Sequence, residues 1–131
     1  MKKHEENAMK IAVFLENHHR INKVYYPGLP SDPCHDLAKR QMSGFSGIVS
    51  FKMDKGDKEM VNSFFKKLTI ISLAESLGGV ESLICYPPEM THASMPEEQR
   101  NSLGITKDLI RFSVGIEDAE DLIEDISEAL K

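Results

Sequence analysis

The chain opens on a pattern of apolar residues that recurs every three or four positions. That spacing places side chains on one face of an α-helix, and it predicts a helix over about residues 3 to 18. The residues on this face are Ala8, Ile11, Ala12 and Leu15, widened by Met9, Val13 and Phe14. The same spacing returns after Asp57 and after Asp118, which predicts one helix running to about Lys67 and another at the C-terminus. Both aspartates suit a helix N-cap, because a carboxylate there accepts a hydrogen bond from a free backbone amide of the first turn.

Two shorter helices are predicted from their start signals. Asp32 followed by Pro33 suits an N-cap and the first helical position of a helix that extends through Gln41. Ser94 and Glu97 resemble a capping box, in which each side chain bonds the other residue's backbone amide. We therefore expect a short helix after each signal.

Short apolar stretches that end at turn residues predict the strands. They are Val24–Tyr26, Ile48–Met53, Leu83–Tyr86 and Leu109–Val114, with a further strand entry at Thr69–Ser72. Several connections between them are tight turns, which favour antiparallel pairing over a doubly wound parallel sheet. The expected fold is a single α/β domain of the α+β type over residues 1–131, with a small, mostly antiparallel sheet covered by helices.

Composition narrows the classes of function. A net charge of −5 without a visible basic patch argues against a nucleic-acid partner. No apolar run approaches the roughly 20 residues that cross a bilayer, and the polar start lacks a signal peptide, so we expect a cytoplasmic protein without a membrane partner. Two cysteines and five histidines lack zinc-ligand spacing, which predicts no metal site and free thiols. The acidic residues near the C-terminus are expected to form a solvated helix face: Glu117, Asp118, Glu120, Asp121, Glu124, Asp125 and Glu128.

Arg111 is the first candidate for chemistry. Alternation along Leu109–Val114 puts Ile110, Phe112 and Val114 on one face of the strand and Arg111 on the other. An arginine on so apolar a strand needs an anionic partner or a path to solvent. Its planar guanidinium suits bidentate binding of a carboxylate, either from a ligand or from one of the chain's own acidic side chains. The residues alone leave both interpretations open.

Two loops are further candidates. In the first, Glu75 and Ser76 precede the pair Gly78-Gly79, which allows close approach to a ligand or a simple turn between strands. In the second, Thr91 and His92 offer a hydroxyl and a possible general base, although a lone loop histidine is more often structural. Neither loop contains a nucleophile elbow, a P-loop or a dinucleotide fingerprint.

These motifs together carry a resemblance to a known family. Their order and residues resemble the C-terminal region of the Cys/Met-metabolism pyridoxal-phosphate enzymes, of which cystathionine γ-synthase and γ-lyase are the nearest members. The matching stretches are Val24–Leu29, Leu37–Phe45, Leu73–Leu83, Met90–Ala93 and Leu109–Asp118. The resemblance implies the C-terminal domain of the aspartate-aminotransferase-like, fold type I architecture. It also implies that the N-terminal cofactor domain, with the catalytic lysine and the cofactor-binding residues, lies outside this chain.

By the same resemblance, Arg111 matches the residue that grips the substrate's α-carboxylate, and Ser76 assists that grip. Glu75 falls where family members differ, and an acid there would attract the distal ammonium of cystathionine. Thr91 would orient Glu75 or the substrate. The chain would therefore hold substrate-binding residues, and it would hold no catalytic, cofactor-binding or metal-binding ones.

The implied parent enzyme performs γ-replacement or γ-elimination on sulfur amino acids in transsulfuration. Its partners would be pyridoxal phosphate and either cystathionine or an O-acylhomoserine with cysteine, and family members are typically homotetramers. Whether these 131 residues are themselves an enzyme stays open, since no lysine here sits in the family's catalytic motif. The alternative is a non-catalytic amino-acid-binding or structural module of the same fold.

Overall fold

Five strands form one sheet in the order β1-β2-β5-β4-β3, and the computed structural model describes all residues from 1 to 131. The strands are β1 (Ile21–Tyr25), β2 (Ile48–Met53), β3 (Ser72–Leu73), β4 (Leu83–Cys85) and β5 (Leu109–Ser113). All neighbours pair antiparallel except β3 and β4, which are parallel. The expected mostly antiparallel sheet is therefore confirmed.

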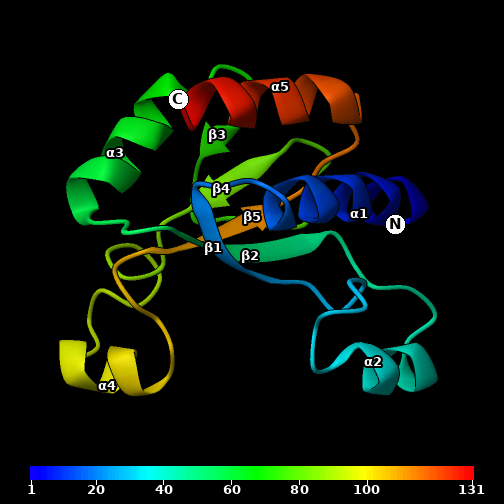
Figure 1. The fold of residues 1–131 in the computed structure, drawn as a ribbon, viewed down its shortest axis with the longest axis horizontal. Coiled ribbons are helices and arrows are strands. Elements are labelled where there is room, and N and C mark those ends of the chain that lie inside the picture. Colours follow the sequence, from blue (N-terminus) through cyan, green and yellow to red (C-terminus); the bar gives the residue numbers. More distant parts are fainter.

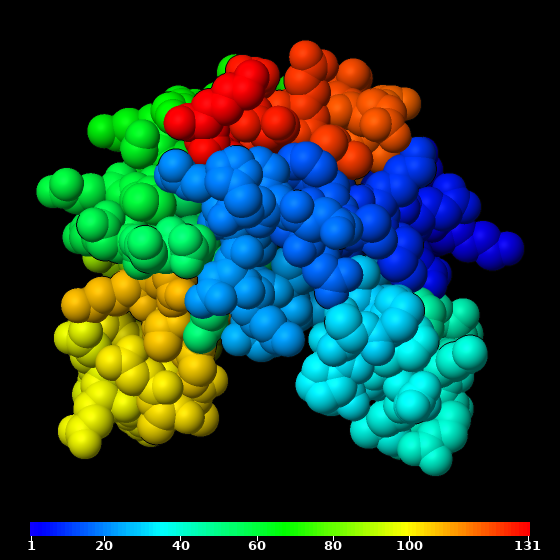
Figure 2. Space-filling model, in the orientation of Figure 1, coloured from blue at the N-terminus to red at the C-terminus, as the bar shows by residue number.

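Helices cover one face of this sheet. They are α1 (Lys2–Glu16), α3 (Lys58–Lys67) and α5 (Ala119–Ala129), which Figure 1 shows on the same side of the strands. The two remaining helices, α2 (His35–Gln41) and α4 (Glu97–Ser102), project on the other side as separate lobes. In the space-filling view, the surface is indented between these lobes (Figure 2).

The core lies between the sheet and its three covering helices. From the sheet, Phe51, Ile84 and Phe112 are fully buried. The helices meet them with apolar residues at helical spacing, and the buried ones in the core are Ala8, Ile11, Ala12, Leu15, Val61, Phe64, Leu122, Ile126 and Ala129. Burying each of the larger side chains among these contributes roughly 1.5–3 kcal/mol, so this apolar face decides how the helices pack. No helix is long and apolar enough to cross a membrane.

The second face of the sheet is only partly covered. Its outward residues on β2 and β5, such as Ser50, Lys52 and Arg111, are half-buried. On β1, Tyr25 faces the same side, with the Lys52 ammonium 6.0 Å from the centre of its ring. The alternation expected for β5 is confirmed, because Ile110 and Phe112 point into the core while Arg111 points away.

Two of the four helix-start interpretations are confirmed. The Asp57 carboxylate accepts the amide of Met60 at 2.9 Å, and Asp118 accepts that of Glu120 at 2.8 Å. The interpretation of Asp32 was wrong. Its carboxylate instead accepts the amides of Tyr26 (3.1 Å) and Cys34 (2.8 Å), and α2 begins only at His35. Asp32 thus closes the turn ahead of the helix, a local bond that competes with capping.

The capping box was also wrong. The residue before α4 is Pro96, and no side chain caps this helix. Elsewhere the boundaries moved slightly, as β1 begins at Ile21 and β3 at Ser72. A signal of a few residues fixes the presence of a helix better than its first residue, because helix ends are set by local competition between bonds.

The acidic C-terminal face is not uniformly solvated, which corrects the expectation for Asp125 and Glu117. Asp125 is 6% exposed and accepts bonds from the Thr69 hydroxyl (2.7 Å) and from the amides of Thr69, Ile70 and Ile71 (2.8, 3.0 and 3.1 Å). Glu117 is half-buried and accepts bonds from Ser82. Each carboxylate serves backbone amides of another segment, which charge patterning along one helix cannot reveal.

Candidate substrate-binding site

Arg111 stands on the central strand β5, on the face that the helices leave uncovered. Its neighbours across the sheet are Ser50 of β2 and Cys85 of β4. The guanidinium donates to the backbone carbonyl oxygen of Glu75 at 2.8 Å, and Arg111 takes part in none of the ion pairs of the chain. Since a guanidinium has five N–H donors, most remain available for an incoming anion. Of the two interpretations left open by the sequence, the structure contradicts an internal ion pair.

The segment that receives this bond is the glycine loop, defined as Ala74–Ser82 between β3 and β4. Gly78 has a φ of 77°, in the left-handed region, and no atom lies near the position of a Cβ there. Glycine is therefore favoured here because it adopts a left-handed φ without strain, and not because a larger side chain would clash. The positive φ of Gly78 agrees with the turn interpretation, and the close approach of this loop to a ligand stays a prediction.

Glu75 and Ser76 lie on the outer part of this loop. Both are exposed, and neither side chain makes a hydrogen bond within the chain. Burial raises the pKa of the Cys85 thiol, Arg111 opposes that rise, and Glu75 adds to it. Glu75 and Arg111 therefore shift the pKa of the same buried thiol in opposite directions, because their charges are opposite. A carboxylate on the loop and a guanidinium on the strand bonded to that loop are charges that suit a zwitterionic ligand with a carboxylate and a distant ammonium.

Thr91 makes its side-chain hydrogen bond elsewhere. It lies in the turn after β4, where its hydroxyl bonds the Nδ1 atom of His92 at 2.7 Å. The His92 amide in turn bonds the Pro87 carbonyl oxygen at 3.0 Å. The structure joins Arg111 to the backbone of Glu75, with Ser76 next along the loop, and it gives Thr91 no hydrogen bond to any of them.

Sequence reasoning missed three residues that hold the loop. Ser113 accepts the amide of Gly78 at 2.8 Å, and Glu117 accepts the amide and the hydroxyl of Ser82 at 2.6 and 2.8 Å. Asn7 of α1 donates to the carbonyl oxygens of Gly115 and Glu117 at 3.1 and 2.8 Å. A signal for Ser113 was available, since it shares the outward strand face with Arg111. Nothing local marks Asn7, whose partners lie more than a hundred residues away.

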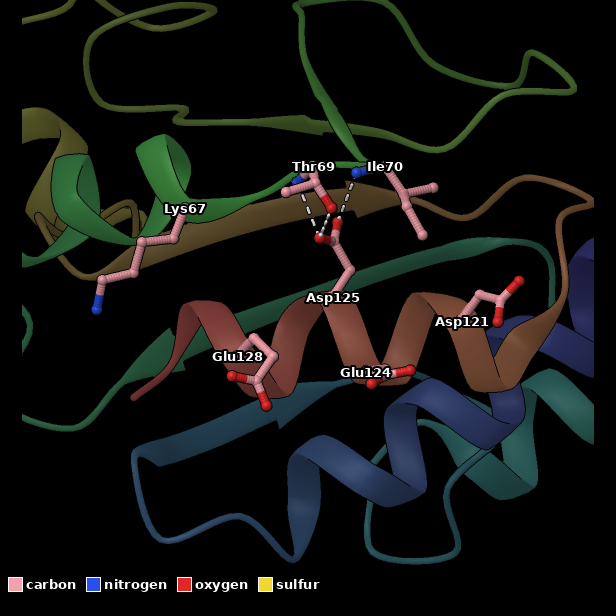
Figure 3. A pocket seen from close by; sticks show the side chains of 7 residues that line it. All are labelled: Lys67, Thr69, Ile70, Asp121, Glu124, Asp125 and Glu128. Carbon is pink, nitrogen blue, oxygen red and sulfur yellow. Dashed lines mark hydrogen bonds between the residues drawn. The ribbon is translucent and has the colours of Figure 1, made fainter.

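The hollow drawn in Figure 3 is not a second site. It measures about 300 Å³ and lies between α5 and the segment after α3, with Lys67, Thr69, Asp121, Glu124 and Glu128 along its walls. Its one buried carboxylate, Asp125, turns toward Thr69 and Ile70 and is already saturated by their hydrogen bonds. The hollow therefore offers a ligand only solvated surface groups.

The fold and the site define a class of protein. The model of the Cys/Met metabolism PLP-dependent enzyme family matches residues 1–131, and the chain belongs to that family. Pyridoxal phosphate is the cofactor of this family, and fold type I is its architecture. The expected family, fold and cofactor of the parent enzyme are thereby confirmed.

Particular relatives are close in sequence and structure. Cystathionine gamma-lyase of Bacillus subtilis (strain 168) is 57% identical over 127 residues, which are 97% of this chain and 33% of the relative. Cystathionine beta-lyase of Lactococcus lactis subsp. cremoris is 54% identical, over 100% of this chain and 34% of the relative. The crystal structure of cystathionine gamma synthase from Xanthomonas oryzae pv. oryzae in complex with cystathionine matches with a TM-score of 0.94 at 48% identity, over 99% of this chain and 33% of that one.

The chain spans about a third of the length of these relatives. Their names cover a gamma-lyase, a beta-lyase and a gamma-synthase. Similarity of this degree therefore establishes the family without choosing among the three reactions.

Proposed function

We propose that residues 1–131 are the substrate-facing C-terminal domain of a longer, pyridoxal-phosphate-dependent enzyme that acts on cystathionine or a related sulfur amino acid. The observation that carries this proposal is the Arg111 guanidinium, which lies beside the glycine loop and has no acidic partner of its own. A half-buried cation without a counter-ion is stabilised when a carboxylate ligand arrives. In this role Arg111 orients the substrate and does not react with it.

Glu75 supplies the second point of recognition. Its exposed carboxylate stands on the loop whose carbonyl holds Arg111, and we propose that a ligand bound at Arg111 reaches this carboxylate with its far end. Cystathionine carries an ammonium group at its far end, which this carboxylate would attract. Ser76, next along the loop, would add a hydroxyl or backbone contact to the bound carboxylate. Thr91 would act only if the turn after β4 moves toward the loop on binding.

The cofactor would be held by residues outside this chain. A lysine that forms a Schiff base is activated by being removed from water, and every lysine here is exposed except Lys52, which is half-buried beside Tyr25. The present residues do not fit a pyridoxal-phosphate pocket by themselves. When bound to the rest of the enzyme, the cofactor supplies the electron sink, and this domain supplies orientation.

Product analysis of the full-length protein tests the proposal. We expect turnover of cystathionine that depends on added pyridoxal phosphate. Release of cysteine, ammonia and a four-carbon 2-oxo acid indicates γ-elimination, whereas homocysteine, ammonia and pyruvate indicate β-elimination. Formation of cystathionine from an O-acylhomoserine and cysteine indicates γ-replacement. Absence of all three reactions in the loaded protein would contradict the proposal.

A second candidate function is a free-standing amino-acid-binding module. It is favoured by the fact that Arg111, Glu75 and their loop take up their arrangement within this chain alone. Calorimetry of the 131-residue chain with cystathionine separates the two proposals. Micromolar binding supports a sensor, and millimolar or absent binding supports a domain that needs its cofactor partner.

A further inference from the structure

We propose that Ser113 and Glu117 are positioning residues that clamp the glycine loop at its middle and at its C-terminal end, and thereby hold Arg111 and Glu75 ready for substrate. The inference rests on the proposed function and extends it to residues that touch no ligand. It starts from the exposure of the loop itself. Glu75, Ser76, Leu77 and Gly78 are all exposed, so packing within this chain does not fix their position. Other bonds must therefore do so.

The first clamp is Ser113. It lies two residues after Arg111 on the same outward face of β5, it is 2% exposed, and its hydroxyl oxygen accepts the amide of Gly78 at 2.8 Å. Strand β5 thus holds the loop twice, through Arg111 at Glu75 and through Ser113 at Gly78. The short stretch between these two bonds contains Ser76 and Leu77, so its path is set at both ends.

The second clamp is Glu117, in the turn between β5 and α5. Its carboxylate accepts both the amide and the hydroxyl of Ser82, and the Ser82 hydroxyl oxygen accepts the amide of Gly115 at 2.9 Å. Beside it, the amide of Ile116 bonds the Val80 carbonyl oxygen at 2.9 Å. A Cβ on Gly115 would overlap both the Glu117 carboxylate and the Val80 carbonyl. The turn and the loop therefore fit together without room for a side chain.

Helix α1 supports this turn from the core side. Asn7 is fully buried, and its amide group donates to the carbonyl oxygens of Gly115 and Glu117. His4 is hydrogen-bonded through Nδ1 to the Val114 carbonyl oxygen at 2.7 Å. The clamp is thus attached to a helix that packs in the core of the domain. Loss of either clamp would free the loop and leave the core intact.

The test uses the full-length holoenzyme and two matched pairs of variants. Ser113→Ala removes the first acceptor, and Ser113→Thr keeps it, with room for the added methyl in a cavity of about 160 Å³ that Ser113 lines. Glu117→Gln weakens the second clamp, and Glu120→Gln removes a similar charge from an exposed site on α5. For each variant, we would measure kcat and KM for the amino-acid substrate, and hydrogen exchange of the loop peptide.

We expect Ser113→Ala and Glu117→Gln to raise KM roughly fivefold, the effect of one net hydrogen bond of about 1 kcal/mol, with kcat little changed. Exchange of loop amides should accelerate in both, while peptides of α3 stay protected. Ser113→Thr and Glu120→Gln should match the unsubstituted protein in both readouts. Unchanged loop exchange would overturn the clamp, and faster exchange with an unchanged KM would overturn its link to substrate. If the unsubstituted enzyme turns over no amino acid, the proposed function fails, while the exchange comparison still decides the clamp.

Discussion

At the scale of single residues, Arg111 shows why position decides what a charge can do. A guanidinium on an exposed helix would add little to the binding free energy of an anionic ligand, because water screens its charge. Arg111 is half-buried on a central strand, fixed at 2.8 Å from the Glu75 carbonyl oxygen, and free of any ion pair. The side chain has therefore lost most of its conformational entropy before substrate arrives. Such preorganisation favours strong bidentate binding.

Replacement of Arg111 by alanine in the full-length protein should weaken substrate binding by about 2–4 kcal/mol, because a charge-assisted bidentate pair is lost. Steady-state kinetics with cystathionine measure the effect as a loss in kcat/KM. Arg111→Lys serves as the comparison, and we expect it to recover only part of the loss, since lysine keeps the charge but not the planar fork. An unchanged kcat/KM in Arg111→Ala would remove this residue from the site.

Glu75 is predicted to select among substrates and not to support binding in general. Glu75→Ser should lower the preference for cystathionine over an amino acid without a distal ammonium by roughly two- to fivefold, the scale of one exposed charge pair. Competition assays with the two substrates give this ratio directly. Glu81→Ser is the matched control, because Glu81 is an exposed acid at the other end of the same loop. A ratio that does not move in Glu75→Ser would refute the role.

At the scale of elements, side-chain hydrogen bonds tie loops to neighbouring strands, turns and helices. The glycine loop is tied to β5 by Ser113 and to the following turn by Glu117. The segment after α3 is tied to α5 by Asp125. Each tie joins backbone amides that would otherwise lack partners. The apolar core positions the helices, and these polar ties position the loops.

Gly78 offers a test of backbone conformation in the loop. Its left-handed φ makes Gly78→Ala cost about 1–2 kcal/mol in local strain. Gly104, with a φ of 78° beyond α4, is the matched control, because a Cβ would meet no atom at either position. We expect thermal denaturation to show similar losses of stability in both variants. Only Gly78→Ala should also raise KM in the full-length protein, and an equal KM in the two would contradict the loop's role.

Asp125 makes the link between α5 and the end of α3 sensitive to acid. Burial tends to raise its pKa, but the bonds from the Thr69 hydroxyl and the three amides outweigh burial and leave the pKa below the ordinary aspartate value. The folded state therefore binds this proton less tightly than the unfolded chain does. The stabilisation is complete at neutral pH, begins to fade near the ordinary aspartate pKa, and is lost as the pH falls through the lower folded-state value.

Asp125→Asn should accordingly lower the free energy of unfolding by about 2 kcal/mol at neutral pH, the scale of hydrogen bonds to a charged group. The difference from the unsubstituted protein should shrink as the pH is lowered through the acid range. Urea denaturation at a series of pH values measures both effects, with the exposed Glu124→Gln as control. A difference that is constant with pH would show that the Asp125 charge is not what stabilises the link.

At the scale of the whole molecule, the sheet has one covered and one open face. Helices α1, α3 and α5 bury the first, and the second lies in the hollow between the lobes of α2 and α4 (Figures 1 and 2). Large apolar residues on or beside the glycine loop are exposed, namely Leu73, Leu77, Val80 and Ile116. The relatives described above are about three times as long as this chain. We propose that the additional part of a longer enzyme covers this face.

The 131-residue chain should therefore behave as a domain with uncovered apolar surface. We expect it to bind a fluorescent dye specific for apolar surface or to self-associate in sedimentation experiments, since patches above a few hundred Å² promote association. The combined substitution Leu77→Ser and Val80→Ser should reduce both effects. A chain that stays monomeric and does not raise the fluorescence of the dye would contradict the proposal that another domain covers this face.

The sequence by itself determined the class of fold, the alternation of β5 and the family. Apolar spacing is local, so it marks helices and strands wherever burial dominates, as in α1 and β2. It also placed Arg111 on the open face, because strand alternation needs no knowledge of the partner. Two caps, at Asp57 and Asp118, were equally visible for the same local reason.

Only the tertiary structure decided what the polar residues do. Asp125 and Glu117 belong to an acidic run that looks solvated, yet each binds backbone amides at least 35 residues away. Asp32 and Ser94 carry good helix-start signals, yet one closes a turn and the other caps nothing. Hydrogen bonds are directional and short-ranged, so a polar side chain's role depends on which segment the packed core brings within about 3 Å of it.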